Sequence, residues 1–164
     1  MIQTRVARTE DIGMISAVLA ASWKTAYRGM VDDGYLDALE DSHWVEFLKK
    51  GHLSGNVFSM VLEEDQLMIG AAILAKSLNE QEIYLLSFYL LPEKIGRGFG
   101  RVFYHEIEEE MLKRGYTRCV LDVLKDNQRA IRFYIANQFT DTGKEIEASL
   151  GGINYSCKVF EKGL

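Results

Sequence analysis

The 164-residue sequence is poor in cysteine, histidine and proline. It contains two cysteines, three histidines and one proline. Cys119 and Cys157 are far apart and lie in segments where apolar residues alternate, so we expect buried thiols rather than a disulfide framework or a CxxC redox motif. No histidine has a second ligand type three or four residues away. The sequence therefore predicts no metal site.

The chain also lacks a long hydrophobic run and an excess of positive charge. No stretch approaches the ~18 uncharged apolar residues of a membrane-spanning helix, and the first residues lack the apolar core of a signal peptide. The formal net charge is −5, which gives no general attraction to nucleic acid or to an acidic membrane. We therefore expect a cytoplasmic protein with neither nucleic acid nor membrane as a partner.

The sequence does contain enough apolar material for a folded core. Apolar residues make up 48% of the chain and charged residues 26%, a composition that is typical of globular domains and excludes disordered and collagen-like classes. The length fits one compact unit, and no repeat or linker interrupts it. We expect a single domain over residues 1–164.

Helical and strand-like patterns alternate along this domain. Apolar residues three and four positions apart predict helices over 12–28, 99–114 and 128–137, and two short helices within 32–50. The run over 83–91 is almost continuously apolar, which predicts a central strand buried on both faces. A loop is expected over 51–56, and further strands over 2–7, 57–62, 67–75, 117–124, 139–147 and 153–160. This order predicts an α/β fold, a mixed and mostly antiparallel sheet flanked by helices.

A glycine-dense segment follows the proline that ends the central strand. It reads Gly96-Arg97-Gly98-Phe99-Gly100-Arg101. Glycines at alternate positions allow successive backbone N–H groups to turn toward one point, and the start of the next helix adds free donors. The segment predicts an anion cradle with Arg97 and Arg101 as counter-charges, and the alternative is a tight turn that needs positive φ. Its spacing matches neither a P-loop nor a GxGxxG dinucleotide motif.

Strand, proline and glycine-rich loop together resemble the acetyl-CoA pyrophosphate loop of the GNAT N-acetyltransferase superfamily, with its pattern (Gln/Arg)-x-x-Gly-x-(Gly/Ala). The segment 121–134 is similar to the second signature of that family, a strand, then Asn127, then a helix that carries Ala130 and Tyr134. The two signatures occur in the expected order. Ile95 stands where the family has Gln or Arg, so a side-chain contact is lost there while the backbone cradle is kept.

The resemblance implies an N-acetyltransferase with acetyl-CoA as co-substrate and no metal. Main-chain groups of Phe88, Tyr89 and Leu90 would pair with the pantetheine arm like an added strand. The segment from Gly96 to Arg101 would hold the pyrophosphate. Asn127 would bond the amide arm, or serve only as the cap of the next helix. Tyr134 would hydrogen-bond or protonate the leaving thiolate, or be a core aromatic.

The expected acceptor is a primary amine of a small molecule or peptide, which attacks directly in a ternary complex. Its proton needs an acceptor, for which Glu82 is the first candidate, with Ser87 orienting a water and Asp122 as a weaker choice. Trp23 and Tyr27 are candidates for the wall of the acceptor cleft, with core packing as the alternative. A homodimer is expected from the family alone.

Two other functions stay open on the sequence. A non-catalytic acyl-CoA-binding sensor would keep the cradle without turnover. A nucleotide-binding domain would take ATP or NAD in place of coenzyme A. Neither cysteine has a recognisable activating partner, so no covalent acyl-enzyme is expected.

Overall fold

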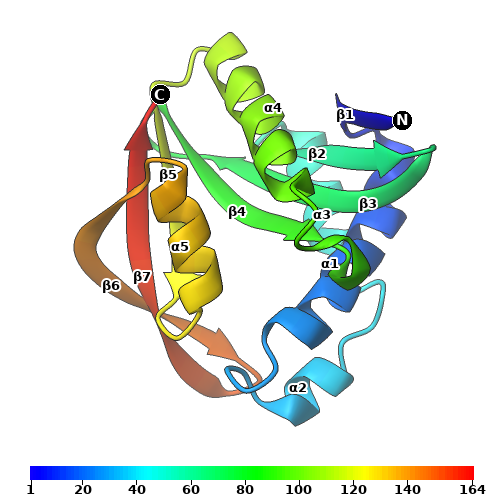
Figure 1. Cartoon of the computed structure of the whole chain (residues 1–164), viewed down its shortest axis with the longest axis vertical. Coiled ribbons are helices and arrows are strands. Elements are labelled where there is room, and N and C mark those ends of the chain that lie inside the picture. Colours follow the sequence, from blue (N-terminus) through cyan, green and yellow to red (C-terminus); the bar gives the residue numbers. More distant parts are fainter.

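The structure is a computed structural model that describes residues 1–164, and it contains one seven-stranded sheet with helices on both faces (Figure 1). The strands are β1 (Ile2–Val6), β2 (Val57–Glu64), β3 (Leu67–Lys76), β4 (Glu82–Leu90), β5 (Arg118–Leu124), β6 (Thr140–Leu150) and β7 (Ile153–Gly163). The helices are α1 (Ile12–Ala26), α2 (Asp33–Asp37), α3 (Val45–Ser54), α4 (Phe99–Lys113) and α5 (Gln128–Ala136), with single 3-10 turns η1 (Thr9–Asp11) and η2 (Pro92–Lys94). The expected α/β class is confirmed.

The sheet has the strand order β1-β2-β3-β4-β5-β7-β6. Five of its neighbouring pairs are antiparallel, and the pair β4–β5 is parallel. This last pair is short, because only Glu82–Tyr84 of β4 lie opposite Arg118–Val120 of β5. Beyond these residues the two strands diverge, and Figure 1 shows the sheet opening into two halves. We call this opening the split.

Two hydrophobic clusters fix the helices to the two faces of the sheet. On one face, α4 packs through Phe103, Ile107 and Met111, residues spaced four apart as expected for an amphipathic helix. On the other face, α1 packs through buried residues such as Ile15 and Leu19 against β2 and β3. No helix combines the length and the apolar character needed to cross a membrane.

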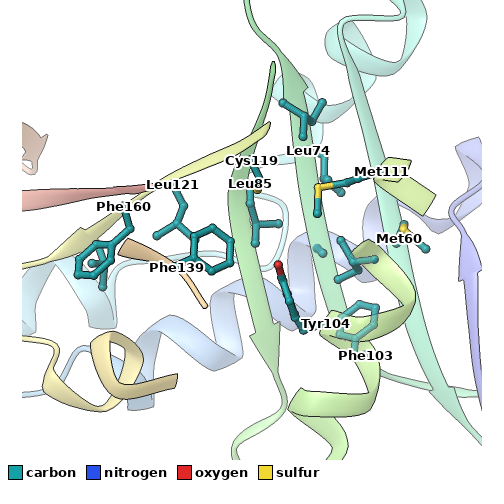
Figure 2. Packing of buried hydrophobic residues seen from close by; sticks show 14 of the residues in the cluster. Met60, Leu74, Leu85, Phe103, Tyr104, Met111, Cys119, Leu121, Phe139 and Phe160 are labelled. Atoms are coloured by element: carbon teal, nitrogen blue, oxygen red, sulfur yellow. The ribbon is translucent and has the colours of Figure 1, made fainter. Parts of the chain in front are cut away.

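The α4 cluster also joins the two halves of the sheet. Phe103 and Met111 of α4 belong to one cluster with Leu85 of β4, and Figure 2 shows this cluster continuing to Leu121 of β5 and Phe160 of β7. Fully burying side chains of this size contributes ~1.5–3 kcal/mol each. The halves are therefore held together by side-chain packing where backbone pairing is short.

Two expectations about elements are wrong in part. The predicted loop over 51–56 is mostly helix, since α3 continues to Ser54. A Cβ at Gly51 would lie 2.6 Å from the side chain of Val57, so this glycine allows α3 to approach β2 and does not end the helix. The strand β4 is not buried on both faces, because only Ile83 and Leu85 are buried and its second half borders the split.

Candidate active site

A cleft of about 460 Å³ lies where β4 and β5 separate. Its walls come from the end of β4, the glycine-rich loop, the first turns of α4 and α5, and the end of α1. The predicted site residues that line it are Phe88, Tyr89, Leu90, Gly96, Gly98, Gly100, Arg101, Asn127 and Tyr134. The two sequence signatures are distant in the chain, and the fold brings them together in one cavity.

The glycine-rich loop offers an uninterrupted series of hydrogen-bond donors. Gly96 and Gly98 both have a φ of 83°, a conformation that side chains disfavour. The N–H groups of residues 96–101 make no hydrogen bond within the protein, whereas the next residue, Val102, donates to the carbonyl of Gly98. The helix dipole of α4 adds partial positive charge at the same place. The loop therefore fits a group with several anionic oxygens.

The end of β4 presents alternate backbone groups to the cleft. The N–H of Leu91 donates to the carbonyl of Ile69 on β3 at 2.8 Å. In an antiparallel pair the backbone groups alternate in direction, so those of Tyr89 face β3 and those of Phe88 and Leu90 face the cleft. Phe88 and Leu90 could therefore pair with an added strand, and the expectation that the backbone of Tyr89 also does so is wrong.

Tyr134 brings a phenol to the cleft from α5. Its ring packs edge-on against Phe133 and Phe139, with ring centroids 5.5 Å from each, which fixes the position of the hydroxyl. This hydroxyl makes no hydrogen bond within the protein. Burial raises the pKa of Tyr134 above its ordinary value, so the group is protonated at neutral pH and able to donate.

Asn127 caps α5 and also borders the cleft. Its side-chain oxygen accepts the N–H of Ala130 at 3.2 Å and so caps α5. The same side chain lines the cleft, and its amide N–H groups are free to donate there. The cap fixes the orientation of the Asn127 side chain at the edge of the cleft.

Comparison with known proteins shows which family has this arrangement. Residues 18–137 match the model of the Acetyltransferase (GNAT) family. The chain belongs to this family. It is 32% identical over 139 residues to the uncharacterized N-acetyltransferase YuaI of Bacillus subtilis, covering 83% of this chain and 79% of YuaI. It is 27% identical over 146 residues to spermidine N(1)-acetyltransferase of Thermoplasma acidophilum, covering 84% and 88% of the two chains.

A solved structure shows the same fold. The PaiA N-acetyltransferase of Thermoplasma acidophilum, in complex with coenzyme A, superposes with a TM-score of 0.75 at 22% identity, over 100% of this chain and 99% of that one. The chain is accordingly an acetyl-CoA-dependent GNAT N-acetyltransferase. The free N–H groups of its glycine-rich loop fit the diphosphate of this co-substrate, and the cleft-facing edge of β4 fits its amide arm. No group of three or more His, Cys, Asp or Glu side chains is placed to hold a metal.

Two polar residues of this GNAT cleft were not predicted from the sequence. Ser22 of α1 is buried, and its hydroxyl donates to the carbonyl of Leu90 at 2.9 Å, which connects α1 to the end of β4. Ser22 is four positions after Val18 on the apolar face of α1, and a serine on such a face was the available signal. Arg129 lines the cleft in the first turn of α5, beside the helix N-terminus.

The expected base Glu82 lies at the closed end of the split. Its carboxylate pairs with Arg118 at 3.2 Å and accepts the hydroxyl of Ser77 at 3.1 Å. It is eight residues from Leu90, or ~26 Å along an extended strand. Its position therefore contradicts the proposed role as base, because the group is remote and already paired. Ser87 is on the same strand, and it does not line the cleft.

Trp23 and Tyr27 are packed beside the cleft rather than in its wall. Their ring centroids are 4.8 Å apart, and the Tyr27 hydroxyl hydrogen-bonds that of Tyr89. Burial raises the pKa of Tyr89 well above its ordinary value, so this phenol pair is neutral. The structure thus favours the alternative of core packing for Trp23 and Tyr27. They fix the Tyr89 side chain, which itself lines the cleft.

Of the remaining predicted residues of the loop, one lines the cleft and two lie beside it. Arg101 lines the cleft, while Arg97 is exposed on the loop beside it. Phe99 packs its ring against the α4 cluster and contributes only its N–H group to the loop. The cradle is thus built mainly from backbone, with Arg101 and Arg129 as its nearest cations.

Asp122, the weaker candidate for the base, lies on β5 near the opening of the split. It is two residues after Val120, the last residue of β5 that pairs with β4, so it lies where the split begins. Its neighbours Leu121 and Val123 belong to the α4 cluster, and strand alternation therefore directs Asp122 to the opposite face. It forms no ion pair. Its side chain is exposed and does not itself line the cleft, and partial desolvation raises the pKa of its carboxyl above the ordinary value.

Proposed function

We propose that this GNAT enzyme transfers the acetyl group of acetyl-CoA to a primary amine of a small molecule, by direct attack in a ternary complex. One observation carries the proposal. The free donors of the glycine-rich loop, the cleft-facing edge of β4 and the unused hydroxyl of Tyr134 border a single cavity. This arrangement supports binding of the donor at one end and stabilisation of the leaving thiolate at the other.

In this proposal the donor is held chiefly by backbone. The N–H groups of residues 96–101 bind the diphosphate, with Arg101 and Arg129 as counter-charges. Phe88 and Leu90 pair with the amide arm, and Asn127 adds a side-chain donor. Bound acetyl-CoA supplies the thioester that the amine attacks.

The amine must lose a proton before it can act as a nucleophile. An alkylammonium has a pKa near ~10.4 and is mostly protonated at neutral pH. Asp122 is the carboxylate at the opening of the split that no cation neutralises, and its raised pKa makes it a better proton acceptor than an ordinary aspartate. We assign it the role of base, acting through water. This replaces Glu82.

Backbone and side-chain donors of the chain then stabilise the negative charge that develops on the oxygen and the sulfur of the thioester. The N–H groups of Phe88 and Leu90 both face the cleft, so one can pair with the amide arm while the other donates to an oxygen that becomes negative. The Tyr134 hydroxyl acts by donating a hydrogen bond to the departing sulfur, and it keeps its proton because its raised pKa lies above the ~8.5 of a thiol like that of cysteine. The proton of the amine leaves through Asp122, and the released thiolate takes its proton from water.

The choice of a small-molecule amine has support from a relative. One similar protein is, by name, a spermidine N(1)-acetyltransferase, and the two chains match over 84% of this one. The net charge of −5 favours cationic acceptors in general. Both points support an amine as the acceptor, and neither identifies which amine it is.

The test is a panel of primary amines, with release of free coenzyme A followed by thiol titration and the product identified by mass. We expect amine-dependent thiol release and an N-acetyl product. Coenzyme A binding without turnover of any amine would instead favour the non-catalytic sensor. An acetylated Cys119 or Cys157 in the mass spectrum would contradict direct attack.

A further inference from the structure

A second cavity of about 310 Å³ adjoins the acetyl-CoA cleft. It is lined by the turn after β5, the beginning of β7 and Met30, and it is open to solvent on the side of the exposed Asp126. Met30 lines both cavities, and Asp126 of the second is the chain neighbour of Asn127 in the first. The two spaces therefore lie on either side of one turn. At ~30 Å³ per water-sized group, the second cavity has room for about ten non-hydrogen atoms.

The two cavities differ in charge. The acetyl-CoA cleft contains Arg101 and Arg129 and receives the N-termini of two helices. The second cavity contains Lys125 and Asp126. Lys125 is paired with Glu145 at 3.0 Å, while Asp126 has no cation partner. The second cavity is thus left with an uncompensated negative charge next to a cleft suited to a polyanion.

Neutral polar groups add acceptors beside Asp126. Tyr155 and Asn154 line the cavity, and the hydroxyl of Tyr155 accepts the N–H of Asp32 at 2.9 Å. This bond fixes the phenol between β7 and the start of α2. A carboxylate, an amide oxygen and a phenol oxygen are ligands suited to an ammonium group.

We propose that the second cavity binds the distal ammonium of a diamine or polyamine acceptor, with Asp126 as the specificity-determining residue. This inference rests on the proposed function. One nitrogen of the acceptor reacts in the cleft, while a second, separated by a short alkyl chain, remains charged and lies against Asp126. The contact is the same before and during the reaction, so it lowers KM and leaves kcat unchanged.

The experiment compares n-butylamine with 1,4-diaminobutane, which differ in the second amine. With the unaltered enzyme we expect kcat/KM to be about 3–5-fold higher for the diamine, the size of an ion pair to the exposed Asp126. The difference should lie in KM. In D126N the preference should disappear, while kcat/KM for n-butylamine and the affinity for coenzyme A stay unchanged. Asn127 still caps α5 in this variant, so folding is preserved.

Two controls make the outcome specific. D126E keeps the charge and should retain most of the diamine preference. E106Q removes an unpaired carboxylate from the exposed face of α4 and should change nothing. Equal kcat/KM for the two amines, or a preference that survives in D126N, would overturn this inference and leave the proposed function intact. Absence of turnover with every amine would overturn the proposed function itself.

Discussion

At the scale of the residue, some polar groups of the site are already hydrogen-bonded or ion-paired within the protein, and others are not. The hydroxyl of Ser22 and the carboxylate of Glu82 are bound to other parts of the chain, and they therefore position elements. The hydroxyl of Tyr134 and the carboxylate of Asp122 have no partner within the protein. Groups without partners are available to a substrate, and the assignment of chemistry rests on this difference.

The role of Tyr134 predicts a selective loss of rate in Y134F. The substitution removes the hydroxyl and keeps the ring between Phe133 and Phe139. We expect kcat to fall by about 100-fold, the lower end for a lost hydrogen bond to a developing negative charge, while the dissociation constant of coenzyme A is little changed. Steady-state kinetics and titration calorimetry measure the two quantities. Y116F, in a half-buried phenol that packs on the α4 cluster, is the matched control. Unchanged kcat in Y134F would show that the Tyr134 hydroxyl does not assist departure of the thiolate.

Asp122 predicts a particular pH dependence. Its carboxyl has a raised pKa, and only the ionised form accepts a proton. The value of kcat/KM should therefore fall as the pH decreases through that pKa, at a pH above the ~3.9 of an ordinary aspartate. In D122N the activity should be lower and this acidic limb should be absent. A limb that persists in D122N would assign the titration to another group.

At the scale of the element, the sequence predicts what depends on local periodicity. The helices α4 and α5 and the strand β5 lie within a residue or two of the expected bounds, because each has one apolar face. The predicted end of α3 was wrong, since the spacing of apolar residues along the chain does not reveal the contact of Gly51 with Val57. The exposure of β4 was wrong for a similar reason. Its apolar residues line a cleft, and a run of apolar residues has the same appearance in a core and in a cleft.

The edge of β4 predicts an alternating pattern of amide exchange. The N–H groups of Tyr89 and Leu91 face β3 and should exchange slowly with or without ligand. Those of Phe88 and Leu90 face the cleft and should exchange rapidly in the free enzyme. Coenzyme A should slow the exchange of Phe88 and Leu90 only. Residue-resolved NMR measures all four in one sample, so Tyr89 and Leu91 are internal controls. Protection of Tyr89 alone would mean that the strand register is different.

At the scale of the whole molecule, the site is a consequence of an incomplete sheet. The β4–β5 pairing covers three residues of each strand, and the core on the α4 side joins the halves beyond it. The residues that the sequence assigns to the donor line one cleft, because each signature is a strand followed by a helix start. The sequence did not predict the positions of Ser22, Asp122 and the second cavity. These depend on segments that come together only when the split has formed.

Because the donor cleft lies between the two halves, coenzyme A should stabilise the whole domain. A ligand that binds only the folded chain adds ~2.7 kcal/mol at a concentration of 100 Kd. For a domain of this size, ~2–4 °C per kcal/mol corresponds to a rise in Tm of about 5–11 °C. Differential scanning calorimetry measures it. ATP and NAD carry phosphates and adenine without the pantetheine arm that the edge of β4 would bind, so the same concentrations should raise Tm much less. An equal rise with ATP would mean that the loop alone determines binding and that Phe88 and Leu90 contribute nothing.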